Sequence, residues 1–450
     1  MTLFHQELLD RFGGPAPRPC SCGEAHRLGL REVIIGAGAL AESAARFSSG
    51  AARRAWVLSD GNTEAAAGVR FKSLVRGKRI TSHVLPAQPR PVPTEALVAE
   101  LAGEVRAAAP ELIVAVGSGV VSDLGKAISR ETGIPNWAVA TALSVDAYAS
   151  PTAAIRVKGY HQPLPATPSE VVVCDLEVLA AAPRLLLLAG LGDLLAKYLA
   201  RVDWLLSHLV TGESFCEAIS AMALGAARGA IRATTAERQG GPEATAALAD
   251  AVLVSGLCMQ AVGTSRPAAA AEHTIAHFWE MAGAVTIEAH DLHGLLVGAA
   301  SRPILRGYAA AHPRLAKAPV DPEGRREALI AAPPVPPLPA EMERFRATVD
   351  EVAAARAPAP LAGVRLDAWQ RHREEILERS GPVLADLSTA VKALERLGFP
   401  FAPTELGIAE PWLRHGVRFV RQLRARYTTF DLAHDLGVEE GLIADVLSGL

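Results

Sequence analysis

The chain has few cysteines, no uninterrupted apolar run of membrane-spanning length and no excess of positive charge. Five cysteines among 450 residues are too few and too scattered for a disulfide framework, and Cys174, Cys216 and Cys258 lie in apolar runs typical of core thiols. The 45 Lys and Arg against 48 Asp and Glu give a net charge of −3, which excludes long-range attraction for nucleic acid or anionic lipid. Any anionic substrate therefore has to be bound by local contacts.

Targeting signals are also lacking. Residues 1–7 include an acidic side chain and no apolar core of signal-peptide type. The most apolar later stretch, residues 176–196, is interrupted by a proline and three charged residues. We therefore expect a soluble cytoplasmic protein with no nucleic-acid or membrane partner. Half of the 450 positions are hydrophobic, which is enough to bury the cores of two or more domains.

The first part of the chain alternates between two kinds of apolar pattern. Short β-rich or apolar runs predict strands, and longer segments with helical spacing of apolar residues predict helices. The predicted strands cover residues 31–35, 55–58, 112–116 and 137–140, and the predicted helices cover residues 94–108 and 123–129. Strands that alternate with helices through about residue 180 indicate a doubly wound parallel sheet.

The later part of the chain has a different pattern of residues. It is rich in Ala and Leu at helical spacing, as in residues 217–239 and 242–260, and it has few β-branched clusters. The Pro-rich residues 332–340 cannot continue a helix and predict an extended surface connection. The sequence therefore predicts an α/β N-terminal Rossmann-like domain with a parallel sheet over residues 1–180, and an all-α C-terminal domain over residues 181–450.

A glycine turn, Gly117-Ser118-Gly119, stands between a predicted buried strand and a predicted helix. Such a turn lets backbone N–H groups approach a nucleotide phosphate, but it is equally typical of an ordinary tight connection. Asp60 ends an earlier strand, where it could accept a bond from a ribose hydroxyl or simply form a turn. Asp123 and Lys126 are one helical turn apart and could be no more than a surface pair.

Three separated positions suggest a divalent-metal site: Asp193, His273 and His293. One carboxylate and two imidazoles leave coordination positions open, which suits a metal that polarises a substrate oxygen. Asp193 falls at the expected start of a helix, so it could instead cap that helix or pair with Lys197. His273 and His277 share a helix face, but the acid that zinc peptidases place between two such histidines is missing. The clustering of histidines in apolar helices favours a site over isolated core residues.

A second group of soft ligands lies near the N-terminus. Cys20, Cys22 and His26 fall within Cys-Ser-Cys-Gly-Glu-Ala-His and could supply three ligands to a metal. No fourth ligand is evident nearby in the sequence. We therefore favour an exposed polar loop, with a second metal site as the alternative.

Several ordered motifs resemble one family across nearly the whole chain. They are Gly117-Ser118-Gly119-Val120-Val121-Ser122-Asp123-Leu124-Gly125-Lys126, the run from Ala140 to Ser150, Gly190-Leu191-Gly192-Asp193-Leu194-Leu195-Ala196-Lys197-Tyr198, Ser265-Arg266-Pro267 leading to Glu272-His273, and Arg424-Ala425-Arg426-Tyr427-Thr428. Together they are similar to the dehydroquinate synthase-like and iron-dependent alcohol dehydrogenase superfamily, in its sn-glycerol-1-phosphate dehydrogenase branch with the AraM-like members.

This resemblance implies roles for particular residues. It implies that Asp193, His273 and His293 bind one divalent metal, with zinc expected first and nickel or iron as alternatives. It implies that Asp146 is a substrate-contacting carboxylate beside the metal, and that Asp146 or His277 takes part in proton transfer. The residues expected to line the NAD or NADP cleft are Gly117, Ser118, Gly119, Asp123, Thr141, Ser144 and Ser150, in addition to Asp60 at its strand end.

The activity implied is the reversible, metal-dependent and NAD(P)H-linked reduction of dihydroxyacetone phosphate to sn-glycerol 1-phosphate, by a homo-oligomer. Three other functions stay open. One is a polyol or glycerol dehydrogenase that acts on an unphosphorylated substrate, and another is a cyclase like dehydroquinate synthase, although the Lys-Asn signature of such cyclases is not found. The third is a binding protein that has lost turnover. The presence of all three expected metal-ligand residues argues against this function.

The chain departs from the branch pattern at the substrate loop. Ala140, Leu143 and Ala147 stand where relatives usually have two prolines and a glycine, so the loop would be less rigidly set. Relatives often carry a Lys near the position of His161, and its replacement removes a permanent positive charge. Lys158 could substitute for it if its loop turns inward.

Overall fold

The computed structural model describes residues 4–157, 160–236, 241–283, 292–331, 335–356 and 361–450; of residues 160–162 it describes the backbone. The chain divides into two compact units. The first unit comprises residues 1–194 and 217–268, and the second comprises residues 195–216 and 269–450. This division groups two helices beyond residue 180 with the N-terminal part, whereas the sequence analysis placed its domain boundary at that residue.

The first unit contains a six-stranded, wholly parallel sheet in the order β3-β10-β7-β6-β4-β5. Its strands are β3 (Glu32–Gly36), β4 (Arg54–Asp60), β5 (Arg79–Leu85), β6 (Leu112–Gly117), β7 (Asn136–Ala140) and β10 (Val171–Asp175). The other strands of this unit form two hairpins, β1 (Arg18–Pro19) with β2 (Ala25–His26) and β8 (Thr152–Val157) with β9 (Tyr160–Pro165). The predicted Rossmann-like domain with a parallel sheet is confirmed.

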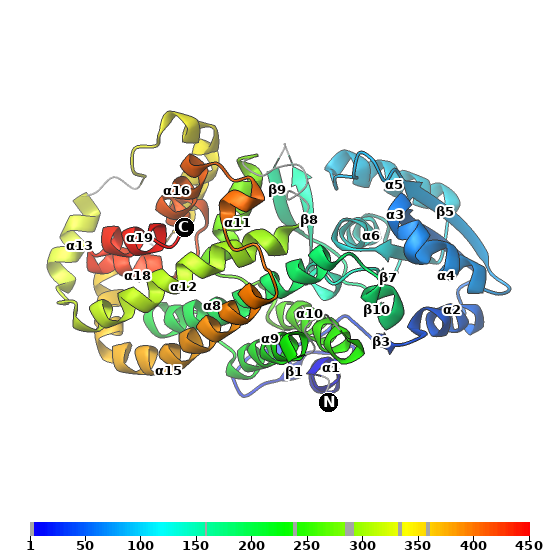
Figure 1. The fold of residues 1–450 in the computed structure, drawn as a ribbon, viewed down its shortest axis with the longest axis horizontal. Helices are drawn as coiled ribbons and strands as arrows, with labels where there is room; N and C mark the ends of the chain where they lie inside the picture. The colour runs from blue at the N-terminus through cyan, green and yellow to red at the C-terminus, as the bar shows by residue number, and fades with distance from the viewer. Residues whose placement is uncertain (1–3, 158–159, 237–240, 284–291, 332–334, 357–360) are drawn as a thin grey trace. The chain divides into compact units, whose positions relative to one another are not determined.

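The helices of the first unit alternate with these strands and then continue beyond them (Figure 1). They are α1 (Phe4–Phe12), α2 (Ala39–Ser49), α3 (Gly61–Thr63), η1 (Glu64–Gly68), α4 (Val69–Leu74), α5 (Glu95–Ala108), α6 (Gly119–Thr132), η2 (Ala147–Ala149), α7 (Leu176–Ala180), α9 (Glu217–Ala236) and α10 (Pro242–Val262). Helix α8 (Arg184–Thr211) begins in the first unit and ends in the second.

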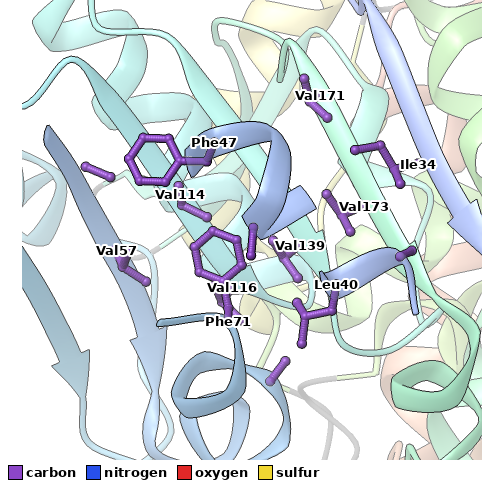
Figure 2. Packing of buried hydrophobic residues seen from close by; sticks show 14 of the residues in the cluster. Ile34, Leu40, Phe47, Val57, Phe71, Val114, Val116, Val139, Val171 and Val173 are labelled. Carbon is purple, nitrogen blue, oxygen red and sulfur yellow. The ribbon is translucent and has the colours of Figure 1, made fainter. Parts of the chain in front are cut away.

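Strand β6 shows why the sheet has a core on both faces. All six of its residues are buried, and successive side chains of a strand point to opposite faces. Val114 and Val116 pack on one face with Phe47 of α2 (Figure 2). Ile113 packs on the opposite face with Leu124 of α6. A strand of this kind reads as a continuous apolar run, which is why it was predictable from the sequence.

The secondary structure of the second unit consists of helices, without a strand among its described residues. This confirms the all-α prediction for the C-terminal part. Its elements are α11 (Ala271–Met281), α12 (His293–Lys317), α13 (Pro322–Ala331), η3 (Ala340–Phe345), α14 (Arg346–Ala355), α15 (Ala362–Arg396), η5 (Pro403–Leu406), α16 (Glu410–Arg418), α17 (Val420–Leu423), α18 (Thr429–Leu436) and α19 (Glu439–Leu447). A buried polar network ties three of its helices together, because Asp203 of α8 accepts bonds from Tyr308 Oη (2.9 Å) and Thr429 N (2.9 Å).

Helix α10 is long and apolar enough to cross a membrane by its length and composition alone. However, 83% of its most apolar window is buried inside the protein. A buried core helix can have the same length and composition, and packing against α9 and α1 explains the apolar residues of α10.

Gly190 of α8 allows a close approach between this helix and the loop after β7. A Cβ at this position would lie 1.8 Å from the carbonyl oxygen of Leu143. We expect Gly190→Ala to destabilise the protein by about 1–3 kcal/mol or more, because overpacking forces the backbone to shift. The fall in the urea midpoint of unfolding measures this effect.

Gly229→Ala in α9 is the matched control for this substitution. A Cβ there would meet nothing within 4 Å. Alanine favours helix by up to about 1 kcal/mol over glycine, so the control should unfold at the same or a higher urea concentration. Equal midpoints for the two variants would contradict the close approach of α8 to the loop.

Candidate active site

The glycine turn lies where β6 leads into α6, at the carboxyl end of a central strand. A Cβ on Gly117 would lie 2.4 Å from the Cβ of Val121, so this connection requires glycine. Ser118 is the N-cap of α6, but its side chain makes no capping bond, and Ser118 and Gly119 are partly exposed. The N–H groups of the first turn of α6 therefore lack a side-chain cap, and a helix N-terminus of this kind suits a phosphate.

The loop after β7 lies directly beside this turn. Ser144 Oγ is 2.9 Å from Ser118 Oγ, and the N–H of Thr141 donates to the carbonyl oxygen of Gly117 (3.2 Å). Both loop residues are only 6% exposed. The structure thus brings Gly117, Ser118, Thr141 and Ser144 together at one edge of the sheet, although their contact with NAD(P) stays a prediction.

Asp123 and Lys126 form a buried ion pair, with Lys126 Nζ 2.9 Å from Asp123 Oδ1. The ammonium of Lys126 also donates to the carbonyl oxygens of Ala147 (2.6 Å) and Thr152 (2.5 Å). The second oxygen of Asp123 accepts a bond from Ala154 N (3.1 Å). The alternative of a surface pair is therefore wrong, because both side chains hold the loop and hairpin β8–β9 against α6.

Two other residues predicted to contact the cofactor make hydrogen bonds within the fold. Ser150 Oγ donates to the carbonyl oxygen of Thr152 (2.8 Å). Asp60 Oδ1 accepts bonds from the N–H groups of Asn62 (2.9 Å) and Thr63 (3.0 Å), which caps the short helix α3. Asp60 thus has the turn-forming role that the sequence allowed, and a ribose contact stays a prediction.

Asp146 lies at the end of the same loop and has two ordered contacts in the first unit. Its backbone N–H donates to Asp193 Oδ2 (3.1 Å), and its own Oδ2 accepts a bond from Ser255 Oγ of α10 (2.6 Å). Asp193 is 1% exposed and lies nine residues beyond the first residue of α8. The expectation that Asp193 caps a helix is therefore wrong, because a cap precedes the first turn.

In the second unit, His273 lies in the first turn of α11 and is 7% exposed. Its Nδ1 is 2.9 Å from Glu272 Oε1, and that oxygen also accepts a bond from Ala270 N (2.7 Å). An ionised carboxylate only accepts hydrogen bonds, so Nδ1 of His273 carries the proton. Its Nε2 is therefore the nitrogen with a lone pair for a metal, oriented by a carboxylate as in many metal sites.

His293 is the first residue of α12, and it shares one carboxylate with His277. Glu280 Oε1 lies 2.8 Å from Nδ1 of His293, and Glu280 Oε2 lies 3.0 Å from Nδ1 of His277. The rings of His277 and His293 stack with centroids 4.7 Å apart, and the ring of His273 lies 5.3 Å from that of His293. Glu280 thus fixes the same tautomer in both histidines.

The charges in this cluster follow from burial and from the neighbouring rings. Burial, together with the nearby His293 and His273, lowers the pKa of His277 to about 4, although the hydrogen bond that His277 donates to Glu280 acts in the opposite direction. Burial alone would raise the pKa of Glu280, but the His293 and His277 rings outweigh it and hold that pKa well below its usual range. His277 is therefore neutral at pH 7, and it can relay a proton but does not store one.

Two sets of donors in this unit could contribute to a metal site. One donor atom each from His273 and His293 lie within 4.8 Å of each other, and so do donors from His277, Glu280 and His293. Both oxygens of Glu280 are already bonded to imidazoles, so the second set would break the contacts that orient the rings. The imidazole nitrogens of His273 and His293 are the better fit for zinc or a similar ion.

Sequence reasoning missed the two carboxylates that hold these rings. Glu280 lies three residues after His277 on one helix face, and that spacing could have identified it. Glu272 lies off the helix face that His273 and His277 share, yet it is bonded to its sequence neighbour His273. Ser255, which bonds Asp146, lies in an apolar helix and has no distinguishing local motif. Lys158, the proposed substitute for the missing lysine, lies outside the described residues.

The chain is similar to known dehydrogenases in sequence and in fold. Residues 34–183 match the iron-containing alcohol dehydrogenase family. A Bacillus licheniformis protein named glycerol-1-phosphate dehydrogenase (NAD(P)+) is 27% identical over 94% of each chain, and one of the same name from Halalkalibacterium halodurans is 31% identical over 64% of this chain and 73% of its own. An iron-containing alcohol dehydrogenase of known structure from Thermococcus thioreducens has the same fold, with a TM-score of 0.60 at 16% identity, covering 94% of this chain and all of its own.

Proposed function

The chain belongs to the glycerol-1-phosphate dehydrogenase family, and on this premise we propose that it catalyses the reversible NAD(P)H-linked reduction of dihydroxyacetone phosphate to sn-glycerol 1-phosphate. The observation that carries the proposal is the pair of imidazoles, His273 and His293, each held by a buried carboxylate. A catalytic metal that polarises a ketone needs such oriented neutral nitrogens. We further propose a cytoplasmic homo-oligomer.

We propose that Asp193, His273 and His293 are the ligands of one divalent metal, zinc first and nickel or iron as alternatives. The donor types fit, because a buried carboxylate and two neutral imidazoles leave the ion a net positive charge. When bound, the ion would polarise the ketone oxygen of the substrate. Glu272 and Glu280 would keep the two rings in the ligating tautomer and strengthen their nitrogens as donors.

We propose that the glycine turn binds the phosphates of NAD(P), which supplies the hydride when bound. The uncapped first turn of α6 offers backbone N–H groups to a phosphate, and Gly117, Ser118, Gly119, Thr141 and Ser144 surround this point. The contribution of Asp60, Asp123 and Ser150 to cofactor binding would be indirect. Their hydrogen bonds fix the strand end, the helix and the loop around the glycine turn.

We propose that Asp146 contacts the substrate and moves a proton. Ser255 holds one oxygen of its carboxylate, and its backbone N–H is bonded to Asp193, so the side chain is fixed on its loop. We propose that this carboxylate accepts a proton from the substrate or donates one to it. His277, neutral at pH 7 and bonded to Glu280, would serve as a relay.

The decisive test compares two substrates in the oxidative direction. If the phosphate is recognised, kcat/KM for sn-glycerol 1-phosphate should exceed that for glycerol by about 10²-fold or more, because each hydrogen bond to a charged group contributes about 1.5–3 kcal/mol. NADH and NADPH formation at saturating cofactor measures both rates. A chelator should abolish both, and net NADH consumption with the ketone would exclude a cyclase.

One observation favours the runner-up, an unphosphorylated polyol dehydrogenase. Lys126, the cation nearest the glycine turn in sequence, is fully buried and bonded to Asp123, Ala147 and Thr152. It is therefore not available to bind a substrate phosphate. Equal efficiency with glycerol and with sn-glycerol 1-phosphate would establish this second function and reject the first.

A further inference from the structure

The hairpin β1–β2 presents three soft donor atoms in the first unit. Its strands pair Arg18 with His26, and the intervening turn is closed by Gly23 N–H donating to the carbonyl of Cys20 (3.0 Å). Gly23 has a φ of 87°, which glycine adopts without strain. The turn holds donors from Cys20, Cys22 and His26 within 4.8 Å of one another, in a protein with no disulfide among its described residues.

His26 is oriented as a metal ligand would be. Its Nδ1 lies 2.8 Å from the carbonyl oxygen of Ala261, so Nδ1 carries the proton and donates. Its Nε2 then has the lone pair, and it faces Cys22 Sγ at 3.2 Å. Ligands on a tetrahedral zinc are roughly 3.5 Å apart, given bonds of about 2.0–2.3 Å. The ring is 4% exposed and is fixed from the side by an edge contact with Phe12.

We propose that Cys20, Cys22 and His26 bind one divalent ion of the zinc type, at a site separate from the proposed catalytic metal. Two thiolates and an imidazole are the ligand types that zinc binds, and one further donor would complete its tetrahedral shell. Nη2 of Arg11 lies 3.6 Å from Cys20 Sγ, so the positive charge of its guanidinium would partly balance the negative charge of the thiolates. This ion would replace the exposed polar loop that the sequence analysis favoured.

The site would fix the N-terminal segment onto the helical layer of the first unit. Helix α1 already lies against α10, with His5 Nδ1 2.6 Å from Asp250 Oδ1 (Figure 1). Beyond the hairpin, the N–H of Gly29 donates to Gln260 Oε1 (2.8 Å). The hairpin between these two anchors is too short to bury a core of its own, so a metal would hold it.

Metal content and cobalt spectra test this proposal without reference to turnover. We expect two zinc ions per chain in the wild type, one in Cys22→Ser, and a normal count in the control Cys258→Ser, whose hydroxyl can keep the bond to the carbonyl oxygen of Ile219. Cobalt substitution should produce a thiolate-to-cobalt charge-transfer band that Cys22→Ser lacks. His273→Ala should keep the band, because the catalytic set contains no sulfur.

A wild-type measurement covers the case in which the cysteine variants do not fold. A mercurial reagent that caps thiolates should release one zinc ion per chain, detected with a chromogenic chelator, and leave the other bound. Release of no zinc, a cobalt protein without the sulfur band, or a single ion that His273→Ala removes would each overturn the proposal. These outcomes leave the proposed reductase activity untouched, so the two proposals fail separately.

Discussion

His273→Ala should lose its catalytic metal and its turnover together. The substitution removes an imidazole that Glu272 holds in the ligating tautomer, and alanine has no side-chain atom that could bind a metal. A metal that polarises a substrate oxygen contributes several kcal/mol to the transition state, so kcat/KM should fall by roughly 10³-fold or more. Metal analysis of the purified variant should show one ion fewer per chain than the wild type.

The control for this variant is His372→Ala, which removes a histidine that is 39% exposed on α15 and whose Nδ1 lies 3.7 Å from Glu375 Oε2. It should retain both metal and activity. If His273→Ala keeps the full metal count, then His273 is not a ligand, and the proposed site has to be rebuilt around His277, Glu280 and His293, the other donor set in that unit.

The sheet was predictable where its strands are buried on both faces. Residues 112–116 and 137–140 stand out as apolar runs, and they correspond to the central strands β6 and β7. The edge strand β5 was missed because its burial alternates irregularly and most of its residues are exposed or half-buried. Strand β10 was missed because its apolar run follows a hairpin that carries no recognised pattern.

Helix boundaries were harder to predict than the helices themselves. The sequence placed the start of a helix at residue 123, whereas α6 begins at Gly119 directly after the turn. Glycine disfavours helix on intrinsic propensity, and here the tight connection from β6 overrides that preference. A similar error put Asp193 at a helix start, whereas α8 begins at Arg184 and continues through Gly190, where it approaches the loop after β7 closely.

The chemistry-bearing residues were predictable by type, while their supports were not. Histidines in apolar helices are unusual enough to be noticed one by one. Glu272, Glu280 and Ser255 are common residue types whose roles appear only when the fold brings them to a ring or a carboxylate. The tautomers of the imidazoles, and therefore which nitrogen can bind a metal, follow from these contacts and from nothing in the sequence.

The side chain of Asp146 is held in place by contacts within the first unit. Ser255 Oγ donates to its Oδ2, and its backbone N–H is bonded to Asp193, so an Asn side chain could occupy the same position and still accept from Ser255. An amide at this place keeps the shape of the carboxylate and loses its ability to take or give a proton. Asp146→Asn therefore separates the chemical role of this residue from its structural one.

We expect Asp146→Asn to lower kcat by about 10²- to 10⁴-fold, the usual contribution of a positioned general acid or base. Metal content and the affinity for NADH should stay at wild-type values, because the variant removes no proposed ligand and no part of the glycine turn. Stopped-flow single turnovers, metal analysis and NADH fluorescence titration measure the three quantities. Ser255→Ala is the matched control, since it leaves the carboxylate in place and should reduce kcat far less. Wild-type turnover in Asp146→Asn would reject the role of Asp146 in proton transfer, whereas loss of metal in that variant would show that the residue supports the metal site instead.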